Sequence, residues 1–594
     1  MRIPILYGIV TYVGEGLDRR FHWNRMPLPL GILSIIGLRE RLRQKNLHDT
    51  GLPDPPAGKT WDRRYLTART IDGSYNDLDR PMMGSVGTRF GRNVPISETW
   101  PDQQPRILEP DPRRVSRDLL TRDEFIPATT LNVIAAAWIQ FEVHDWLSHG
   151  KGDWEKAWEL ELAADDDWPE RPMRIPATRP DPTYRSDSGE PVTFATADSH
   201  WWDGSQIYGS TEPYVSMVRT GQDGKLRIDP DGLLPKELEA GVDLTDAAGN
   251  FWIGLGVLHS LFMQEHNAVC DRLKAEYPDW SDDQLYDKAR LVIAALMAKI
   301  HTVEWTPAVT AHPTMEYAMR ANWWGLKGEG GGPRRGILRN SDMVFGIMGS
   351  PTDHHGAPYS LTEEFVAVYR MHPLLPDEFT FRSADDDRVL AELTFPEVGA
   401  LSTRQRLEEL SVANAFYSLG VAHPGAITLH NYPRFLQHFD RPDGTILDLA
   451  ATDVLRSRER GVPRYNAFRR AFRLPPARDF DDLTDNPEWA RQLREVYDDV
   501  EDVDVMVGMY AEPLLEGFAF SETAFRVFAL MASRRLKSDR FFTRDFTARV
   551  YTQTGLDWIA DNTMVSILLR HHPRLAPALE GVKNAFTPWN RVGG

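Results

Sequence analysis

Apolar residues recur with the period of an α-helix along much of this chain. The pattern predicts helices over residues 131–148, 250–274, 283–302, 360–372, 404–420, 521–537 and 558–570. Alternation of Val, Ile and Thr, which is typical of strands, is scarce, and no Pro/Gly/Ser-rich stretch is long enough to separate domains. We therefore predict a mainly α fold, with one large domain over residues 51–594 that has long irregular connections. A smaller amphipathic region over residues 1–50 precedes it.

The N-terminal region contains an apolar run that is too short to cross a membrane. Its most apolar run, residues 26–38, has 13 residues, whereas a spanning helix needs about 20. Residues 33–42 then mix apolar side chains with arginines and a glutamate. This pattern fits a helix on a membrane surface or over the mouth of a substrate channel. It fits a helix packed against the domain equally well.

The net charge and the cysteine content limit the possible partners of the protein and the compartment in which it acts. The formal net charge is −18, which argues against nucleic acid as a partner, because binding it needs a basic face. Cys270 is the single cysteine of the sequence, so no disulfide can form within it. A reducing compartment is favoured. We expect a cytoplasmic protein, with peripheral membrane contact through residues 1–50 as an addition.

Tyr369 and His372 form the most informative pair in the chain. They lie three apart at the end of residues 363–371, a segment that reads as helix, and residues three apart share a helix face. A histidine can be the axial ligand of haem iron. A phenol beside that haem could lose an electron and a proton to become a radical. The spacing therefore places a phenol that could form a radical beside a possible iron ligand.

A second polar pair lies on a segment that is otherwise almost uniformly apolar. Gln140 and His144 fall four apart within residues 131–146, hence on one face of a helix that is buried all round. Polar side chains in such a place need partners. In isolation, His144 reads as a core histidine bonded to a backbone carbonyl. With the Tyr369/His372 pair downstream, a functional role is favoured.

An acidic loop offers oxygen ligands for a hard cation. Asp145 ends the same apolar segment, and residues 199–205 read Ser-His-Trp-Trp-Asp-Gly-Ser. In an extended segment, alternate residues of this loop face the same way: Ser199, Trp201, Asp203 and Ser205. Hydroxyl, carboxylate and carbonyl oxygens suit calcium. The alternative is an ordinary Asp-Gly turn beside an aromatic residue.

Several separated segments resemble the fatty-acid alpha-dioxygenases, a branch of the cyclooxygenase and animal-type haem peroxidase superfamily. Besides the two pairs above, they include Arg69-Thr70-Ile71-Asp72-Gly73, Phe90-Gly91-Arg92-Asn93, Glu265-His266-Asn267, His301-Thr302-Val303-Glu304-Trp305-Thr306 and Met531-Ala532-Ser533-Arg534-Arg535-Leu536. Their order along residues 20–590 is more specific than any one of them. The resemblance implies a haem peroxidase-like helical domain with haem b as its cofactor.

The resemblance also implies roles for individual residues. His372 would bind the iron from the proximal side, and Gln140 and His144 would lie on the distal side. A structural calcium ion would be held by Asp145, Ser199, the Trp201 carbonyl, Asp203 and Ser205. In this family a histidine, a threonine and an arginine hold the carboxylate of the fatty acid. The matching residues here are His301, Thr306 and one of Arg534 and Arg535.

Two features of this carboxylate anchor stay open in the sequence. Arginine binds a carboxylate through its planar fork. We favour Arg535, because Arg534 could as well form a structural ion pair, although both could lie on a solvated helix face. His301 and Thr306 are five apart, so either they share only part of a helix face or the helix ends between them. Pro307 supports an ending, since the residue before proline avoids helix. Farther along, Phe525, Phe528, Leu530 and Met531 could line an acyl channel or fill the core.

The leading hypothesis is a haem-dependent alpha-dioxygenase. His144 would act as acid and base on an activating peroxide, either H₂O₂ or a hydroperoxide, and a radical would form on Tyr369. The radical would remove hydrogen from C2 of a fatty acid, and O₂ would add to give the 2-hydroperoxy acid. The alternative is a peroxidase that uses H₂O₂ to oxidise phenols or halides. It needs His144 and His372, but neither Tyr369 nor the carboxylate anchor.

Overall fold

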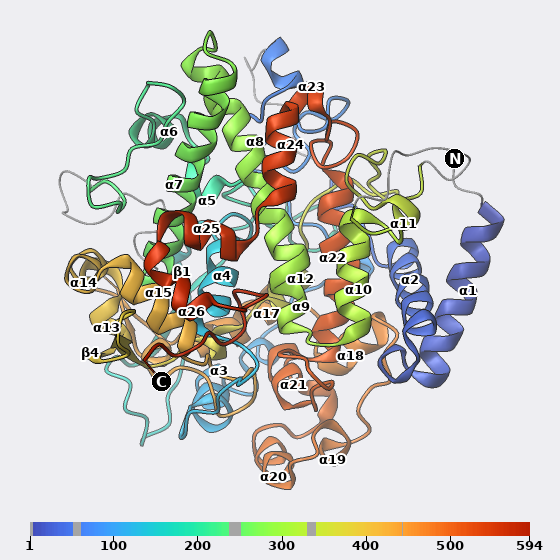
Figure 1. Cartoon of the computed structure of the whole chain (residues 1–594). Helices are drawn as coiled ribbons and strands as arrows, with labels where there is room; N and C mark the ends of the chain where they lie inside the picture. Colours follow the sequence, from blue (N-terminus) through green and yellow to red (C-terminus); the bar gives the residue numbers. More distant parts are fainter. Residues whose placement is uncertain (1–3, 52–60, 237–250, 330–339, 442–443, 594) are drawn as a thin grey trace.

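The computed structural model describes residues 4–51, 61–236, 251–329, 340–441 and 444–593. Helices dominate these residues (Figure 1), and their strands form three two-stranded antiparallel sheets. The pairs are β1 (Asp153–Leu160) with β2 (Met173–Ala177), β3 (Glu378–Arg382) with β4 (Val389–Thr394), and β5 (Phe439–Asp440) with β6 (Ile446–Leu447). The prediction of a mainly α fold with long irregular connections is confirmed. Within the described ranges, no helix combines the length and the apolar character needed to span a membrane.

The core is built around α4 (Val133–Val143), which is buried on nearly all sides. It packs against α15 (Val412–Val421) and α7 (Ile253–Glu276), and α7 lies beside α8 (Asp282–Ile300) (Figure 1). Asn132 begins α4 by accepting a hydrogen bond from the Ala135 amide, because a helix leaves its first amides without partners. Other helices include α6 (Glu212–Val218), α18 (Tyr465–Ala471), α20 (Pro487–Val496) and α21 (Val505–Ala511).

Two of the predicted helices are each divided in the structure. The segment 404–420 forms α14 (Thr403–Leu410) and α15, because Ser411 between them has a φ of 68°. A left-handed residue cannot continue a right-handed helix. The segment 558–570 contains the end of α24 (Gln553–Asp561) and α25 (Met564–His571). The apolar period continues across both breaks, so the sequence pattern did not reveal them.

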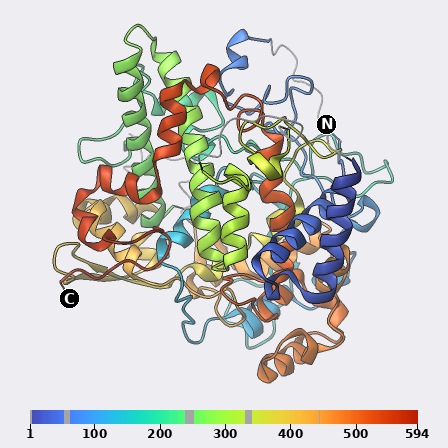
Figure 2. The ribbon, with the colours of Figure 1, turned by 45° about the vertical axis from the view of Figure 1, so that its right-hand side comes forward.

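The N-terminal residues form a helical hairpin at the edge of the molecule (Figure 2). α1 (Pro4–Phe21), which the sequence analysis did not predict, packs on α2 (Leu28–Lys45). The backbones approach closely at two glycines: a Cβ on Gly14 would lie 2.8 Å from the Cα of Gly37. α2 in turn packs against α10 (Pro313–Trp324) and α22 (Glu522–Ser538). α2 therefore packs against the domain.

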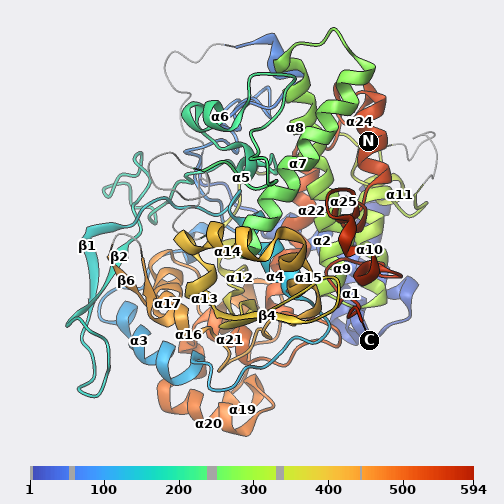
Figure 3. The ribbon, with the colours of Figure 1, turned by 60° about the vertical axis from the view of Figure 1, so that its left-hand side comes forward.

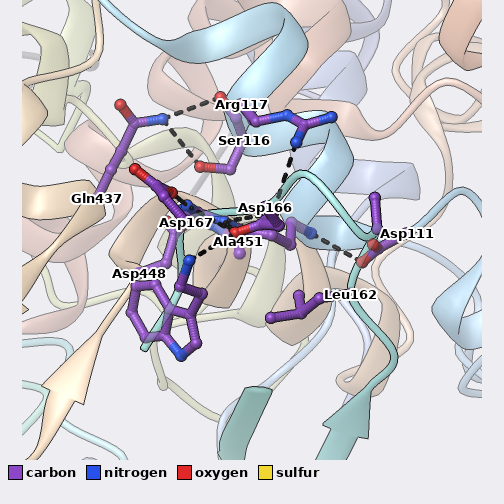
Figure 4. Close-up of polar contacts among 12 residues, drawn as sticks. Asp111, Ser116, Arg117, Leu162, Asp166, Asp167, Gln437, Asp448 and Ala451 are labelled. Atoms are coloured by element: carbon purple, nitrogen blue, oxygen red, sulfur yellow. Dashed lines mark hydrogen bonds and ion pairs between the residues drawn. The ribbon is translucent and has the colours of Figure 1, made fainter. Parts of the chain in front are cut away.

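Polar contacts fix the start of α17 (Leu449–Glu459), a helix that contributes to the site described below. Asp448 caps it by accepting a hydrogen bond from the Ala451 amide. The other carboxylate oxygen of Asp448 accepts one from Nη1 of Arg113 at 2.9 Å. Figure 4 shows this end of the helix, where the side-chain amide of Gln437 donates to Ser116. Because both Asp448 and Arg113 are buried, breaking this pair would be costly.

The hairpin of β1 and β2 covers α17 from the outside (Figure 3). Leu160, Met173 and Ile175 of the hairpin form one apolar cluster with Ala451 and Leu455 of the helix. Ile107 belongs to the same cluster. Burying such apolar area stabilises the fold by about 25 cal/mol per Å². The helix is therefore held both at its N-terminal end and along its outer face.

Candidate active site

Tyr369 and His372 lie on successive, differently oriented turns. α12 (Glu363–Val368) ends before Tyr369, which has φ −86° and ψ 10°, and His372 begins a short 3₁₀ turn. Pro373 accounts for the break, because in a continued helix its ring would clash with the Tyr369 carbonyl four residues earlier. The prediction that both residues share one helix face is therefore wrong. Tyr369 is buried, whereas 28% of the His372 side chain is exposed.

His372 is oriented by a carboxylate that the sequence analysis missed. Its Nδ1 lies 2.9 Å from Oδ2 of Asp453 on α17. Burial would raise the pKa of Asp453, but the charges of Arg370 and His372 outweigh it and hold that pKa below its usual value. An ionised carboxylate at Nδ1 favours the tautomer in which Nε2 is free to bind a metal. Asp453 is 81 residues from His372 in the sequence, so no local pattern could have paired them.

Gln140 and His144 lie at the C-terminal end of α4. The helix predicted over residues 131–148 ends at Val143, and the His144 amide donates to the Gln140 carbonyl. The Gln140 side-chain oxygen accepts a hydrogen bond from the indole of Trp252 at 2.8 Å. Burial lowers the pKa of His144 to about 4, so the imidazole is neutral near pH 7 and can accept a proton. A neutral His144 has the chemistry needed beside a haem iron, and a His372 oriented through Nδ1 has the chemistry of an iron ligand.

Tyr369 opens onto a buried cavity that also contains most of the predicted carboxylate anchor. The cavity is lined by Trp202, His301, Thr302, Thr306, Met319, Asn322, Phe365, Tyr369, Ala532, Ser533, Arg535 and Leu536. The Tyr369 ring stacks on Phe528 at a centroid distance of 5.3 Å. Burial raises the pKa of Tyr369 well above its usual value. The phenol therefore keeps its proton and can give up a whole hydrogen atom.

His301 and Thr306 lie on a widened helical turn at the end of α8. Residues 301–305 form a π-helical turn that continues without a break into α9 (Thr306–Val309). Of the two alternatives, an end of the helix between His301 and Thr306 is not seen, because the widened turn accommodates Pro307 at the start of α9. The Thr306 hydroxyl donates to the His301 carbonyl at 2.8 Å, so it can only accept from a ligand in this arrangement. Nδ1 of His301 lies 3.2 Å from the Trp138 indole nitrogen.

Arg535 points into the cavity between two tryptophans. Its guanidinium carbon lies 3.5 Å from the ring centroid of Trp146 and 4.6 Å from that of Trp202. Nε and Nη2 are buried and have no hydrogen-bond partner among the described residues. No carboxylate in the described ranges forms an ion pair with it. A buried guanidinium with open donors is the arrangement expected for binding an anionic group.

Arg534 points away from the cavity and into the surrounding loop. Its guanidinium donates to the carbonyls of Ala357, Pro358 and Ser360. Burial lowers the pKa of Arg534 to about 10. These contacts tie α22 to the segment that leads into α12. Of the two neighbouring arginines, only Arg535 lines the cavity.

Glu142 and Trp146 were also missed by the sequence analysis. Burial raises the pKa of Glu142 to about 8, although the Trp202 hydrogen bond and the charge of Arg535 act against the shift. The Trp202 indole donates to the Glu142 carboxyl group at 2.7 Å. Glu142 thus holds one of the two rings that enclose Arg535. Glu142 and Trp146 lie beside Gln140 and His144 on the same apolar segment. This proximity in the sequence could have identified them as candidate site residues.

The loop over residues 199–205 is not the extended segment that the sequence suggested. The Trp201 amide donates to the Ser199 hydroxyl, and Ser205 already begins α5 (Ser205–Tyr208) after Gly204, which has φ 78°. Asp145, Asp203 and Ser205 nevertheless come together: the Ser205 amide donates to Asp145 at 2.8 Å and to Asp203 at 3.2 Å. The structure gives no contact of Ser199 or Trp201 with Asp145. The indole of Trp201 instead stacks on Tyr359.

The chemistry of this loop fits a cation. Asp145 and Asp203 are both buried, and burial and the charge of Asp203 raise the pKa of Asp145 well above its usual value. Oδ2 of Asp203 accepts no hydrogen bond from the described residues, and Arg290 lies 3.5 Å from it. A calcium ion would relieve the repulsion between the two carboxylates.

Comparison with known proteins defines the class of this molecule. The animal haem peroxidase family model matches residues 68–585, so the chain belongs to the animal haem peroxidase family. Alpha-dioxygenase PIOX of Pisum sativum is 40% identical over 99% of this chain and 93% of its own length. Alpha-dioxygenase 2 of Arabidopsis thaliana is 39% identical over 97% and 92%.

A solved structure of an alpha-dioxygenase is also similar to this chain. A tyrosine-to-phenylalanine variant of the Oryza sativa fatty acid alpha-dioxygenase, crystallised with palmitic acid, has a TM-score of 0.89 and 35% identity to this chain. The match covers 100% of this chain and 98% of that one. The chain is thus a member of the alpha-dioxygenase branch of the family, and the resemblance seen in its sequence motifs is confirmed.

Proposed function

We propose that this protein is a haem-dependent fatty-acid alpha-dioxygenase that forms 2-hydroperoxy fatty acids. One observation carries the proposal: the Tyr369 phenol lines the same cavity as the Arg535 guanidinium, whose Nε and Nη2 have no hydrogen-bond partner among the described residues. A carboxylate bound at Arg535 places the carbon next to it within the same cavity as the phenol. A peroxidase for phenols or halides has no use for a buried cation at this position.

Each residue of the site has a distinct task in this reaction. His372 would hold a haem, which would supply the one-electron oxidation that generates the radical on Tyr369. His144 accepts a proton from the activating peroxide and returns it to the leaving oxygen, and Gln140 lies beside it. The Tyr369 radical takes the hydrogen atom from C2, O₂ adds to the carbon radical, and the hydrogen atom returns from Tyr369 to the peroxyl oxygen. The phenoxyl radical is thereby restored.

The experiment that tests this function is oxygen uptake by the haem-loaded protein with a C14–C18 fatty acid. Mass spectrometry of the product should show a 2-hydroperoxy acid, or the aldehyde one carbon shorter that forms when it loses CO₂. Bromide and guaiacol with H₂O₂ serve as competing assays. Their oxidation without any fatty-acid-dependent O₂ uptake would favour the peroxidase instead.

The acyl chain is proposed to extend into a second cavity between α2, α10 and α22. This cavity shares Met319, Asn322, Ala532 and Ser533 with the first one. Its walls are mostly apolar and include Ile35 and Ala529 as well as Phe525 and Phe528. Two of the four predicted channel residues thus line it, whereas Leu530 and Met531 are buried without lining it.

Ala529→Phe tests the course of the acyl chain. The larger side chain would fill part of the second cavity, so we expect kcat/KM for a C18 acid to fall about tenfold or more, since a bulky group in a packed site costs 1–3 kcal/mol. A C10 acid should react at nearly the wild-type rate and is the internal control. Equal losses for both acids would mean that the chain takes another route.

The calcium site is proposed to stabilise the fold and to support Arg535. The Trp146 indole donates to Asp145 at 3.2 Å, and the same ring lies under the Arg535 guanidinium. Calcium at one hundred times its Kd would add about 2.7 kcal/mol of stability. Chelation should therefore lower the thermal midpoint and raise KM for the fatty acid. An Asp203→Asn variant should show neither response, and unchanged melting of the wild type in chelator would exclude the site.

The hairpin of α1 and α2 is proposed to bring the protein to a lipid surface. Tyr12, Phe21 and Ile9 on α1 are 81%, 60% and 55% exposed, and α2 beneath it lines the second cavity. Exposed apolar side chains on an amphipathic helix favour the membrane interface. Tyr12→Asp should reduce co-sedimentation with phosphatidylcholine vesicles, whereas Leu401→Asp, at an exposed position outside the hairpin, should not. Absence of wild-type binding would reject the proposal.

A further inference from the structure

A single buried carboxylate, that of Asp453 on α17, faces three side chains that can donate to it. Nδ1 of His372 lies 2.9 Å from Oδ2, and the Tyr432 hydroxyl donates to the same oxygen at 3.1 Å. Nη1 of Arg370 lies 2.8 Å from the other oxygen, Oδ1. Among the described residues, Oδ2 is therefore shared by the imidazole of the proposed iron ligand and by one phenol.

Tyr432 is held in the position from which it reaches Asp453. The residue is fully buried, and its amide donates to the Leu120 carbonyl at 2.9 Å. Its ring lies beside the His372 ring, with the centroids 5.5 Å apart and the planes tilted by 47°. A buried phenol needs an acceptor, and the acceptor that Tyr432 uses is the carboxylate that orients His372.

The donors around Asp453 compete for its negative charge. A carboxylate that pulls on the Nδ1 proton of a histidine ligand makes the opposite nitrogen a stronger electron donor to the metal. A hydrogen bond donated to a charged group is one of the stronger kinds, so the Tyr432 hydroxyl draws part of the Asp453 charge away from His372. Less electron density then reaches a metal at Nε2. For a haem iron this change favours the reduced form, because the hydrogen bonds around the axial ligand set its reduction potential.

We propose that Tyr432 is a positioning residue that raises the reduction potential of the haem through Asp453. The inference rests on the proposed binding of haem at His372. A higher potential favours the loss of an electron from Tyr369, so this hydrogen bond would serve the formation of the radical. Tyr432 does not line the cavity that contains Tyr369 and Arg535. Its influence on the reaction therefore passes through Asp453 and His372 and not through contact with the substrate.

The test is the midpoint potential of the haem-loaded, full-length chain, measured by spectroelectrochemical titration. For Tyr432→Phe we expect the reduction equilibrium to shift about tenfold toward the ferric form, which is about the effect of one hydrogen bond to a charged group. For a one-electron couple this shift is a fall of about 59 mV. Resonance Raman spectra of the ferrous protein should show a higher iron–histidine stretching frequency. The Soret band should remain, since the substitution leaves His372 in place.

Tyr510→Phe is the matched control. Tyr510 on α21 is also buried, and its hydroxyl donates to the Arg370 carbonyl, so the substitution removes a phenol hydroxyl from the same neighbourhood without touching Asp453. The potential and the iron–histidine frequency should equal those of the wild type, although the thermal midpoint should fall in both variants. An equal shift of the potential in both variants would overturn the proposal, because the effect would then be a general loosening of the site.

A second substitution shows whether the effect passes through the carboxylate. In an Asp453→Asn background the charge is already removed, so Tyr432→Phe should change the potential no further. A full shift in that background would overturn the proposal. So would an unchanged potential in the single variant, which would leave Tyr432 a purely structural role. A wild-type chain without any Soret band would refute haem binding at His372 itself, a result distinct from an unchanged potential.

Discussion

Tyr369→Phe is expected to abolish fatty-acid-dependent O₂ uptake while leaving the haem Soret band unchanged. The phenylalanine ring fills the same space beside Phe528 and Phe365 but has no hydrogen atom that it can give up to form a stable radical. Because His372 lies on a separate turn and contacts Asp453, the substitution should not disturb the iron ligand. Activity should fall to the background of the assay, and oxygen-electrode traces with matched haem content measure it.

A matched control is available in the same fold. Tyr551 is also buried, and its hydroxyl donates to the Phe541 carbonyl at 3.1 Å. Tyr551→Phe should cost about 1 kcal/mol of stability and leave O₂ uptake intact. If Tyr369→Phe retained wild-type uptake, the radical role of this residue would be refuted. Loss of uptake in both variants would point to general damage to the fold.

Arg535→Gln is expected to raise KM for fatty acids far more than it lowers kcat. The glutamine amide keeps a polar group between Trp146 and Trp202 but loses the charge that attracts a carboxylate. The loss of a charge-assisted hydrogen bond corresponds to about 10- to 150-fold in affinity. The methyl ester of the same fatty acid should bind the wild type and the variant with similar, weak affinity. Steady-state O₂ uptake over a range of concentrations measures both constants.

The neighbouring arginine provides the contrast. Arg534→Gln removes the donors that hold Ala357, Pro358 and Ser360, so it should lower the thermal midpoint and change KM little. Arg535→Lys keeps the charge without the planar fork and should fall between the wild type and Arg535→Gln. If Arg534→Gln raised KM and Arg535→Gln did not, the anchor would be the other arginine. If neither changed it, the carboxylate would bind elsewhere.

The helix ends show where sequence patterns stop being informative. The apolar period predicted the long helices α7, α8 and α22 to within a few residues, since each runs without a break and is largely buried. It extended α4 beyond Val143 and α12 beyond Val368. The apolar period shows which side of a segment faces the core. It continues across a break in the helix when the residues on both sides of the break face the same core. Ser411 and the widened turn at His301 could be seen only in the backbone itself.

The sequence by itself determined the family of this protein. The Gln140/His144 pair on an apolar segment and the order of the family motifs are properties of the residue order, so they can be read without the fold. The shared helix face expected from the spacing of Tyr369 and His372 did not survive folding. The tertiary structure decided which groups meet. It turned Arg535 into the cavity and Arg534 out of it, and it brought Asp453 to His372. Such pairings join residues far apart in the chain, and their geometry depends on how whole helices pack, which no local spacing records.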